Sequence, residues 1–170
     1  KKLKNKRTGR RMKYKFLNYI GLITLMYLFV TSCDKNRVFE QYTKIPGSTW
    51  NNKNIVHFNV NVADTVNPYN VYINIRNRSQ YQYSNIFLFI TTSAPNGEFV
   101  RDTFEITLAD NKGKWLGKGI GNVWNLQVPY HKNIKFPDRG IYMFDIEQAM
   151  WEKDLAHIVD VGLRVEKTAK

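Results

Sequence analysis

Residues 55–62 read IVHFNVNV, and their apolar and polar side chains alternate from Val56 to Val62. Successive side chains of a β-strand point to opposite faces of the sheet, so a period of two predicts a strand with one face on a core and the other in water. We therefore expect a half-buried strand here, and this stretch decides the fold class.

The same signal recurs along the rest of the chain. Alternation returns at residues 71–76, 103–108 and 159–165, and the continuous apolar run IFLFI at 86–90 predicts a central strand that is covered on both faces. Turn sequences at 95–97, 110–113 and 136–140 separate these stretches. Seven or eight strands at this spacing predict an all-β domain, a single antiparallel β-sandwich that is jelly-roll-like or immunoglobulin-like. Residues 147–157 lack alternation, and we expect one short helix there.

An uncharged and mostly apolar run, FLNYIGLITLMYLFV, occupies residues 16–30. A membrane-spanning helix needs about 20 apolar residues, so this run is better matched to the apolar region of a signal peptide. Lys13 and Lys15 provide the basic segment before it. We expect Met12 to be the true start, with residues 1–11 an upstream extension.

The run ends in Phe-Val-Thr-Ser-Cys, and Cys33 is the single cysteine of the chain. This is similar to a bacterial lipobox, in which small residues precede a cysteine whose thiolate accepts a diacylglyceryl group. We expect a signal peptide over residues 1–32, a lipidated tether over 33–49 and a β-sandwich domain over 50–167. An ordinary secretory signal or an uncleaved anchor helix, with an incidental cysteine, remains the alternative.

The net charge of +12 does not indicate a nucleic-acid partner. Nine of the 26 Lys and Arg residues precede the apolar run, and the remaining 17 face 14 acidic residues. The excess charge therefore belongs to the leader rather than to a basic binding face.

Several short motifs resemble the gliding-motility lipoprotein family GldH of Bacteroidetes. They are NIFLF at 85–89, KGKWLGKGIG at 112–121, Gly-Ile-Tyr at 140–142 and DVGLRVEK at 160–167, in that order after Cys33. The resemblance implies an envelope lipoprotein of the gliding and type IX secretion machinery with no catalytic residue, and it transfers Cys33 as the lipid site. It also implies a membrane anchor and other envelope proteins as partners. We expect an outer-membrane protein that faces the periplasm.

Other residue patterns are weak candidates for sites. Every second residue from Gly117 to Gly121 is glycine, but the spacing fits no nucleotide-binding motif, so a bent strand or one packed closely on Trp115 or Trp124 is the expectation. The histidines His57, His131 and His157 lack ligand spacing, and we expect no metal, cofactor or small-molecule substrate.

Carboxylates and aromatic residues leave more than one interpretation open. The acidic residues are scattered, and the turn at 110–113 lacks the further acidic ligands of a calcium loop. The tyrosines and tryptophans could form core, a partner surface or a sugar-stacking platform. The leading hypothesis is thus a non-enzymatic assembly lipoprotein; the alternatives are a carbohydrate-binding lipoprotein and, last, a tethered hydrolase. The aromatic residues for which these three roles are open are Tyr69, Tyr72, Tyr81, Tyr83, Trp115, Trp124 and Tyr130.

Overall fold

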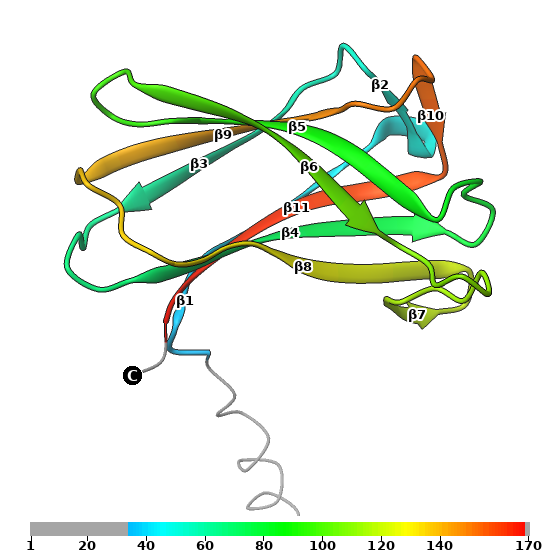
Figure 1. Cartoon of the computed structure of the whole chain (residues 1–170), viewed down its shortest axis with the longest axis horizontal. Coiled ribbons are helices and arrows are strands. Elements are labelled where there is room, and N and C mark those ends of the chain that lie inside the picture. Colours follow the sequence, from blue (N-terminus) through cyan, green and yellow to red (C-terminus); the bar gives the residue numbers. More distant parts are fainter. Residues whose placement is uncertain (1–33, 169–170) are drawn as a thin grey trace, which may run out of the picture. The chain divides into compact units, whose positions relative to one another are not determined.

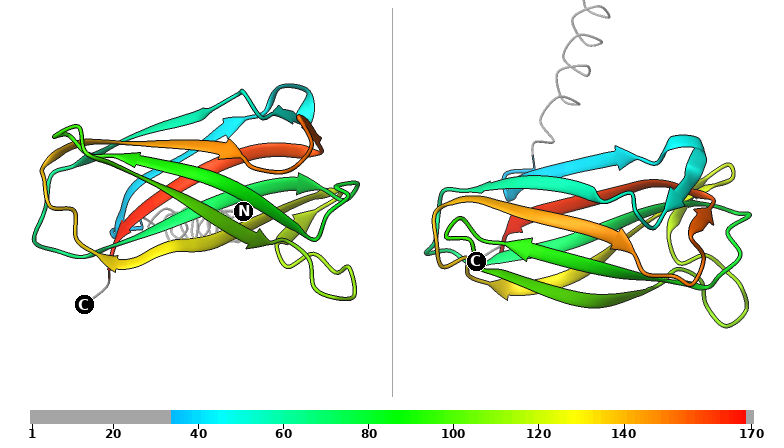
Figure 2. Two further views of the ribbon diagram at one scale, coloured as in Figure 1. Left: turned by 45° about the horizontal axis from the view of Figure 1, so that its top comes forward. Right: turned by 90° about the horizontal axis from the view of Figure 1, so that it is seen from above.

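The structure is a computed structural model that describes residues 34–168. Nine of its strands form two antiparallel sheets that pack face to face as a sandwich, and the two others form a separate two-stranded sheet (Figures 1 and 2). The five-stranded sheet has the order β1-β11-β4-β8-β7, and the four-stranded sheet has the order β3-β9-β5-β6. The fold class expected from the sequence is therefore confirmed.

Eight of the strands are long, and they carry both sheets. They are β1 (Arg37–Lys44), β3 (Val56–Val62), β4 (Tyr69–Arg78), β5 (Asn85–Ser93), β6 (Phe99–Thr107), β8 (Val123–Ile134), β9 (Gly140–Gln148) and β11 (Ile158–Lys167). Three strands have three residues each: β2 (Thr49–Asn51), β7 (Lys118–Ile120) and β10 (Asp154–Ala156). A 3₁₀ turn, η1 (Pro46–Ser48), follows β1.

The core lies between the inner faces of the two sheets. In β3 the burial alternates strictly, with Val56, Phe58, Val60 and Val62 buried and the residues between them exposed, as the period of two predicts. Ile73 of β4 and Leu163 of β11 lie side by side on the facing sheet, and both are fully buried. Burial of such aliphatic side chains contributes roughly 1.5–3 kcal/mol each and dominates the stability of the domain.

The short helix expected over residues 147–157 is wrong. β9 continues to Gln148, and the chain then turns into β10, which pairs with β2. The buried Gln148 side chain forms the turn: its Nε2 donates to the Glu152 carbonyl oxygen at 2.7 Å, and its Oε1 accepts the Met150 N–H at 2.9 Å. The pairing partner lies about a hundred residues earlier in the chain, so local helix propensity could not reveal it.

The sandwich begins earlier than the expected tether allows. β1 starts at Arg37 and pairs with β11 through seven residue pairs, so eight residues of the range 33–49 belong to the five-stranded sheet. The inner face of β1 carries the polar side chains of Gln41 and Thr43 beside Phe39, and this weakens the alternation signal. Phe39 nevertheless makes an edge-to-face contact with Phe58 on β3, at 6.3 Å between ring centroids.

The apolar run at 86–90 is β5, which lies between β9 and β6, but only one of its faces is in the core. Ile86, Leu88 and Ile90 are fully buried. Phe87 and Phe89 lie on the outer face and are half-buried, and the Arg101 guanidinium lies 4.7 Å from the Phe89 ring centroid. Single side chains, rather than a second layer, cover this face.

Candidate functional site

β1 begins at the end of the sandwich where β4 also begins and where β8 ends. Arg37 at the start of β1 pairs with Glu166, Lys167 of β11 pairs with Tyr69, and Tyr69 pairs with Ile134 at the end of β8. Four strands of one sheet therefore place these residues in one row. We call this end of the sandwich the entry end, and define it by Arg37, Lys167, Tyr69 and Ile134.

Asp64, in the β3–β4 loop, ties the entry end together. Its carboxylate accepts hydrogen bonds from Asn67 Nδ2 at 2.7 Å and from Lys167 Nζ at 2.8 Å. These hydrogen bonds hold the pKa of Asp64 far below its usual value, because they favour the charged carboxylate. The loop and the last strand are thereby joined at neutral pH.

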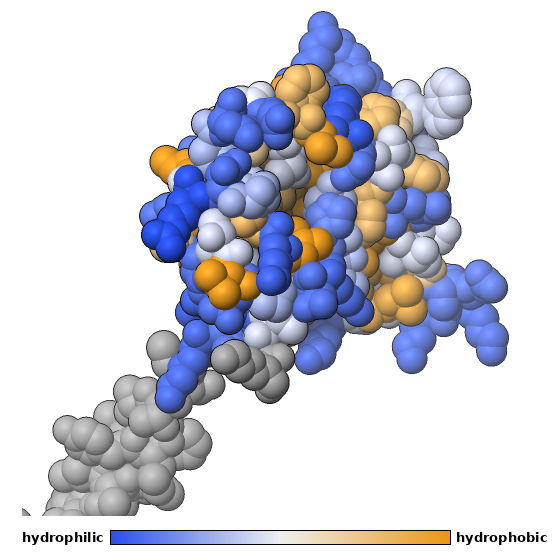
Figure 3. All heavy atoms as spheres, turned by 60° about the vertical axis from the view of Figure 1, so that its left-hand side comes forward, coloured by the Kyte–Doolittle hydropathy of each residue, from blue (hydrophilic) through white to orange (hydrophobic). Residues whose placement is uncertain are grey.

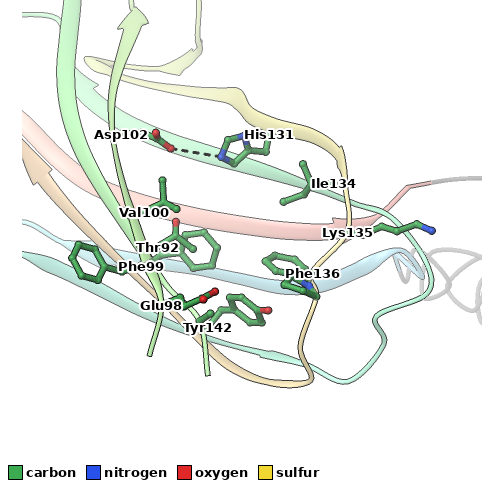
Figure 4. A pocket seen from close by; sticks show the side chains of 13 residues that line it. Thr92, Glu98, Phe99, Val100, Asp102, His131, Ile134, Lys135, Phe136 and Tyr142 are labelled. Carbon is green, nitrogen blue, oxygen red and sulfur yellow. Dashed lines mark ion pairs between the residues drawn. The ribbon is translucent and has the colours of Figure 1, made fainter. Parts of the chain in front are cut away.

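A pocket of about 480 Å³ opens at the entry end, between the β5–β6 hairpin and the β8–β9 connection (Figure 4). Its floor is aromatic, with Phe136, Tyr142 and Phe144 all buried. The Phe136 ring lies 5.3 Å from the ring of Tyr69 and 4.6 Å from that of Tyr142. Packing on both sides fixes these rings, so the floor is a preformed apolar surface.

One wall of the pocket is polar. The Asp102 carboxylate of β6 lies 3.9 Å from Nε2 of His131 of β8 (Figure 4), and the Tyr130 hydroxyl donates a hydrogen bond to the same carboxylate. Burial, with this hydrogen bond, raises the pKa of Tyr130 above its usual value, so the phenol stays protonated. The wall thus links the two sheets through side chains where no backbone pairing joins β6 to β8.

The rim of the pocket is apolar and exposed. Val100 faces inward from β6, opposite Thr92, yet 62% of its surface is exposed, and the neighbouring Phe99 is 69% exposed. β6 is an edge strand, and β7 pairs only with residues 123–125 of β8, so the sandwich is open on this side. Pro129 lies in the part of β8 that β7 leaves uncovered, where its missing N–H costs no pairing. Among residues 34–168, no other side chain therefore fully covers Val100, although it lies on the inner face of β6.

The three histidines lie apart and do not form a metal site. His57 Nδ1 contacts the Asp145 carboxylate at 2.7 Å on the outer face of the four-stranded sheet, whereas His131 is in the pocket wall and His157 precedes β11. Among residues 34–168, no group of three His, Cys, Asp or Glu side chains could hold a metal ion.

The turn at 110–113 uses its carboxylate internally. Asp110 Oδ1 accepts the backbone N–H groups of Lys112 and Lys114, each at 2.9 Å, and Gly113 takes a φ of 77°. This arrangement is an Asx turn, in which the side chain replaces a backbone acceptor. The acidic residue therefore has a structural role in the hairpin.

The glycine stretch packs closely, as expected. A Cβ at Gly119 would lie 2.6 Å from Cε3 of the Trp124 ring, and one at Gly117 would lie 2.7 Å from the Asn125 carbonyl oxygen. Gly121 has a φ of 64°, which glycine adopts without strain. The three glycines thus fold the β7–β8 hairpin onto Trp124.

Most of the candidate aromatic rings belong to the core. Tyr69 and Tyr81 are buried, and Tyr83, Trp115 and Tyr130 pack against the core. Tyr72 is half-buried on the outer face, where its hydroxyl donates to Glu166 at 2.9 Å. Trp124 is half-buried and donates its Nε1–H to Ser79 at 3.0 Å. These seven rings do not form an exposed row.

Sequence reasoning placed the lipid site at Cys33, which lies outside the described residues. It missed the pocket, because Val100 lies more than thirty residues before Ile134 and Phe136 in the chain, and only the folded structure brings them together. Phe99 and Val100 follow the predicted turn at 95–97 as ordinary strand residues, so the sequence carries no signal for the pocket. None of the helices in the described part of the chain has the length and apolarity to cross a bilayer.

Comparison with known proteins decides the family. The pattern of the GldH lipoprotein family matches residues 37–165, which extend from the first residue of β1 into β11. The chain belongs to the GldH lipoprotein family. It is 35% identical over 164 residues to a gliding motility lipoprotein GldH homolog of Christiangramia forsetii, covering 92% of this chain and 99% of that protein. It is 32% identical over 154 residues to the gliding motility lipoprotein GldH of Flavobacterium johnsoniae, covering 86% of this chain and 95% of that protein.

The GldH match includes β1, which supports the boundary that the structure gives. The matched region begins at Arg37, where β1 begins, rather than at Trp50. The relatives are named as gliding motility lipoproteins and not as enzymes. The GldH family match therefore spans the sandwich from its edge strand β1 into β11.

Proposed function

We propose that this GldH-family protein is a non-enzymatic envelope lipoprotein, anchored by lipid on Cys33, with a structural or assembly role in the gliding and type IX secretion machinery. The observation that carries the proposal is the family match, together with the single cysteine that follows the uncharged apolar run at 16–30. Several acyl chains on one cysteine give stable anchoring, because each buried methylene contributes about 0.8 kcal/mol.

The described residues support a structural role over a catalytic one. Three carboxylates serve the fold: Asp64 joins a loop to β11, Asp110 closes a turn, and Asp102 joins the two sheets. Each of these bonds holds elements of the fold together. We place the protein at the outer membrane, facing the periplasm, with other envelope proteins as its partners.

Anchoring is tested with a matched pair of variants. Cys33→Ser removes the acceptor thiol and should move the protein from the membrane pellet to the soluble fraction. Ser32→Ala keeps a small residue before the cysteine and should leave the protein in the pellet. Mass spectrometry of the mature amino terminus should find the acyl adduct only in the parent and in Ser32→Ala. A Cys33→Ser protein that stays in the pellet contradicts the proposal.

The role in the machinery is tested by gene deletion and complementation. The deletion strain should lose colony spreading or the export of secreted proteins, and the parent gene should restore both. Complementation with Cys33→Ser should fail although the domain accumulates to normal levels. Normal spreading and normal secretion in the deletion strain would refute membership of the machinery.

A further inference from the structure

Exposed apolar side chains lie at the entry end. Val66 lies in the β3–β4 loop and Phe99 is the first residue of β6, and both are largely exposed; Ile141, the second residue of β9, is 57% exposed on the outer face. Phe99 lines the pocket together with Val100. Figure 3 shows apolar side chains among hydrophilic ones on this side of the domain. Scattered exposed apolar residues are ordinary, but a group beside an apolar pocket marks a binding surface.

The position of the proposed lipid anchor indicates that a membrane lies next to this surface. Only residues 34–36 separate Cys33 from β1. Four residue steps span at most about 14 Å, so a lipid on Cys33 holds Arg37 within that distance of the bilayer surface. This step depends on the lipidation of Cys33 proposed above.

The pocket lies close to the same point. From Arg37, the row of the entry end crosses β11 and β4 to Ile134, which lines the pocket. Neighbouring strands lie about 4.8 Å apart, so three spacings place Ile134 about 14 Å from the start of β1. A domain that rests on its entry end therefore brings the mouth of the pocket to the bilayer.

We propose that the entry end of the domain lies on the membrane and that its pocket takes a lipid acyl chain. The floor of Phe136, Tyr142 and Phe144 is apolar, which suits hydrocarbon. Its volume of about 480 Å³ is within the range of small-ligand pockets, roughly 300–1,000 Å³. An acyl chain would cover Val100, which the chain leaves 62% exposed on the inner face of β6.

Charges at the rim fit a phospholipid surface. Lys132 near the end of β8 is exposed, as are Lys135 and Arg139 in the β8–β9 connection, and in Figure 4 Lys135 points away from the pocket. The Glu98 side chain lines the pocket as well. Asp138 lies among them and accepts a hydrogen bond from Asn96 at 3.2 Å. Cations beside an apolar surface attract anionic headgroups while the apolar side chains enter the acyl region.

The test compares the two ends of the lipidated, full-length protein in vesicles. Phe99→Cys reports on the entry end, and Ile120→Cys, on the 92% exposed β7 residue of the opposite end, is the matched control. Each cysteine carries an environment-sensitive fluorophore, and Cys33 is blocked by its lipid. The vesicles contain phosphatidylcholine and phosphatidylglycerol, with or without nitroxide-labelled acyl chains.

Nitroxide lipids should reduce the emission at position 99 about twofold or more, because side chains of a surface-bound protein enter the bilayer by about 5–10 Å. The emission at position 120 should stay unchanged. Val100→Asp, which places a charge in the mouth of the pocket, should abolish the quenching at position 99, whereas Ile120→Asp should not.

The outcomes separate this inference from the proposed function. Lipidated protein in the vesicle pellet with no quenching at position 99, or with equal quenching at both ends, refutes the membrane-facing pocket alone. In that case a protein segment is the better occupant of the β6 rim. Protein without the acyl adduct and without vesicle binding refutes the anchoring, and the inference falls with it.

Discussion

Truncation of Leu88 is the sharpest test of the sandwich itself. Leu88 is fully buried in β5, between Gln148 of β9 and Phe104 of β6. Leu→Ala removes three carbon atoms, worth about 2.4 kcal/mol of transfer free energy at about 0.8 kcal/mol each. The residual cavity raises the expected loss to about 3–4 kcal/mol. Leu116→Ala is the matched control, because Leu116 is 52% exposed, and its loss should be about 1 kcal/mol or less.

The assay is thermal unfolding of the lipidated protein in a mild detergent, followed by circular dichroism in the strand region. For a domain of this size, 1 kcal/mol corresponds to a shift in Tm of about 4 °C, so Leu88→Ala should lower Tm by about 12–16 °C. Leu116→Ala should lower it by about 4 °C or less. Equal shifts for the two variants would refute the placement of β5 at the centre of the sheet.

Three further predictions concern particular contacts. The low folded-state pKa of Asp64 means that its carboxylate stabilises the fold above the unfolded pKa of about 3.9, and that this stability is lost as the pH falls toward the folded value. The Tm difference between the parent and Asp64→Asn should therefore shrink below about pH 4, and a constant difference from pH 7 to 2 would contradict this. Gly119→Ala forces its Cβ against the ring of Trp124 and should cost about 1–3 kcal/mol, with a changed near-ultraviolet dichroism; an unchanged spectrum and Tm would count against the packing. Tyr130→Phe removes the hydrogen bond to Asp102 and should cost about 1 kcal/mol at pH 7. The raised folded-state pKa of Tyr130 means that its contribution is complete below about pH 10 and is lost as the pH rises toward the folded value, so the variant should be less sensitive to alkali, and equal alkaline sensitivity would argue against the buried phenol.

The sequence predicts elements whose signal is local. β3 is recognised because the positions between its buried residues are polar, and the β5–β6 turn is recognised from Pro95-Asn96-Gly97, where Gly97 takes a φ of 91°. β1 is not predicted from the sequence, because the polar residues Gln41 and Thr43 on its inner face interrupt the alternation. The segment after Gln148 is rich in helix formers, and its strand β10 exists only through its pairing with β2. Long-range pairing overrides local propensity in both misassigned segments.

The candidate site likewise has one part that local sequence predicts and one part that depends on the fold. Cys33 follows from local chemistry, because a thiol at the end of an apolar run needs no knowledge of the fold. The pocket depends on which strands end the two sheets, and the order β3-β9-β5-β6 cannot be read from alternation. Phe99 and Val100 are ordinary strand residues in sequence, and they become a rim only because β6 has no second neighbour.

The short connection to β1 limits where partners of the domain can be. The longest strand, β8, has twelve residues, so the sandwich is about 40 Å long at about 3.3 Å per residue. With Cys33 lipidated, four residue steps would add at most about 14 Å, and every surface of the domain would stay within about 55 Å of the bilayer. A load on the far end would also run along β1, whose seven residue pairs with β11 would resist together in shear rather than open one by one. With Cys33 as the anchor, a partner that pulls on the domain would therefore act close to the membrane, and the load would pass through β1, the edge strand of the five-stranded sheet.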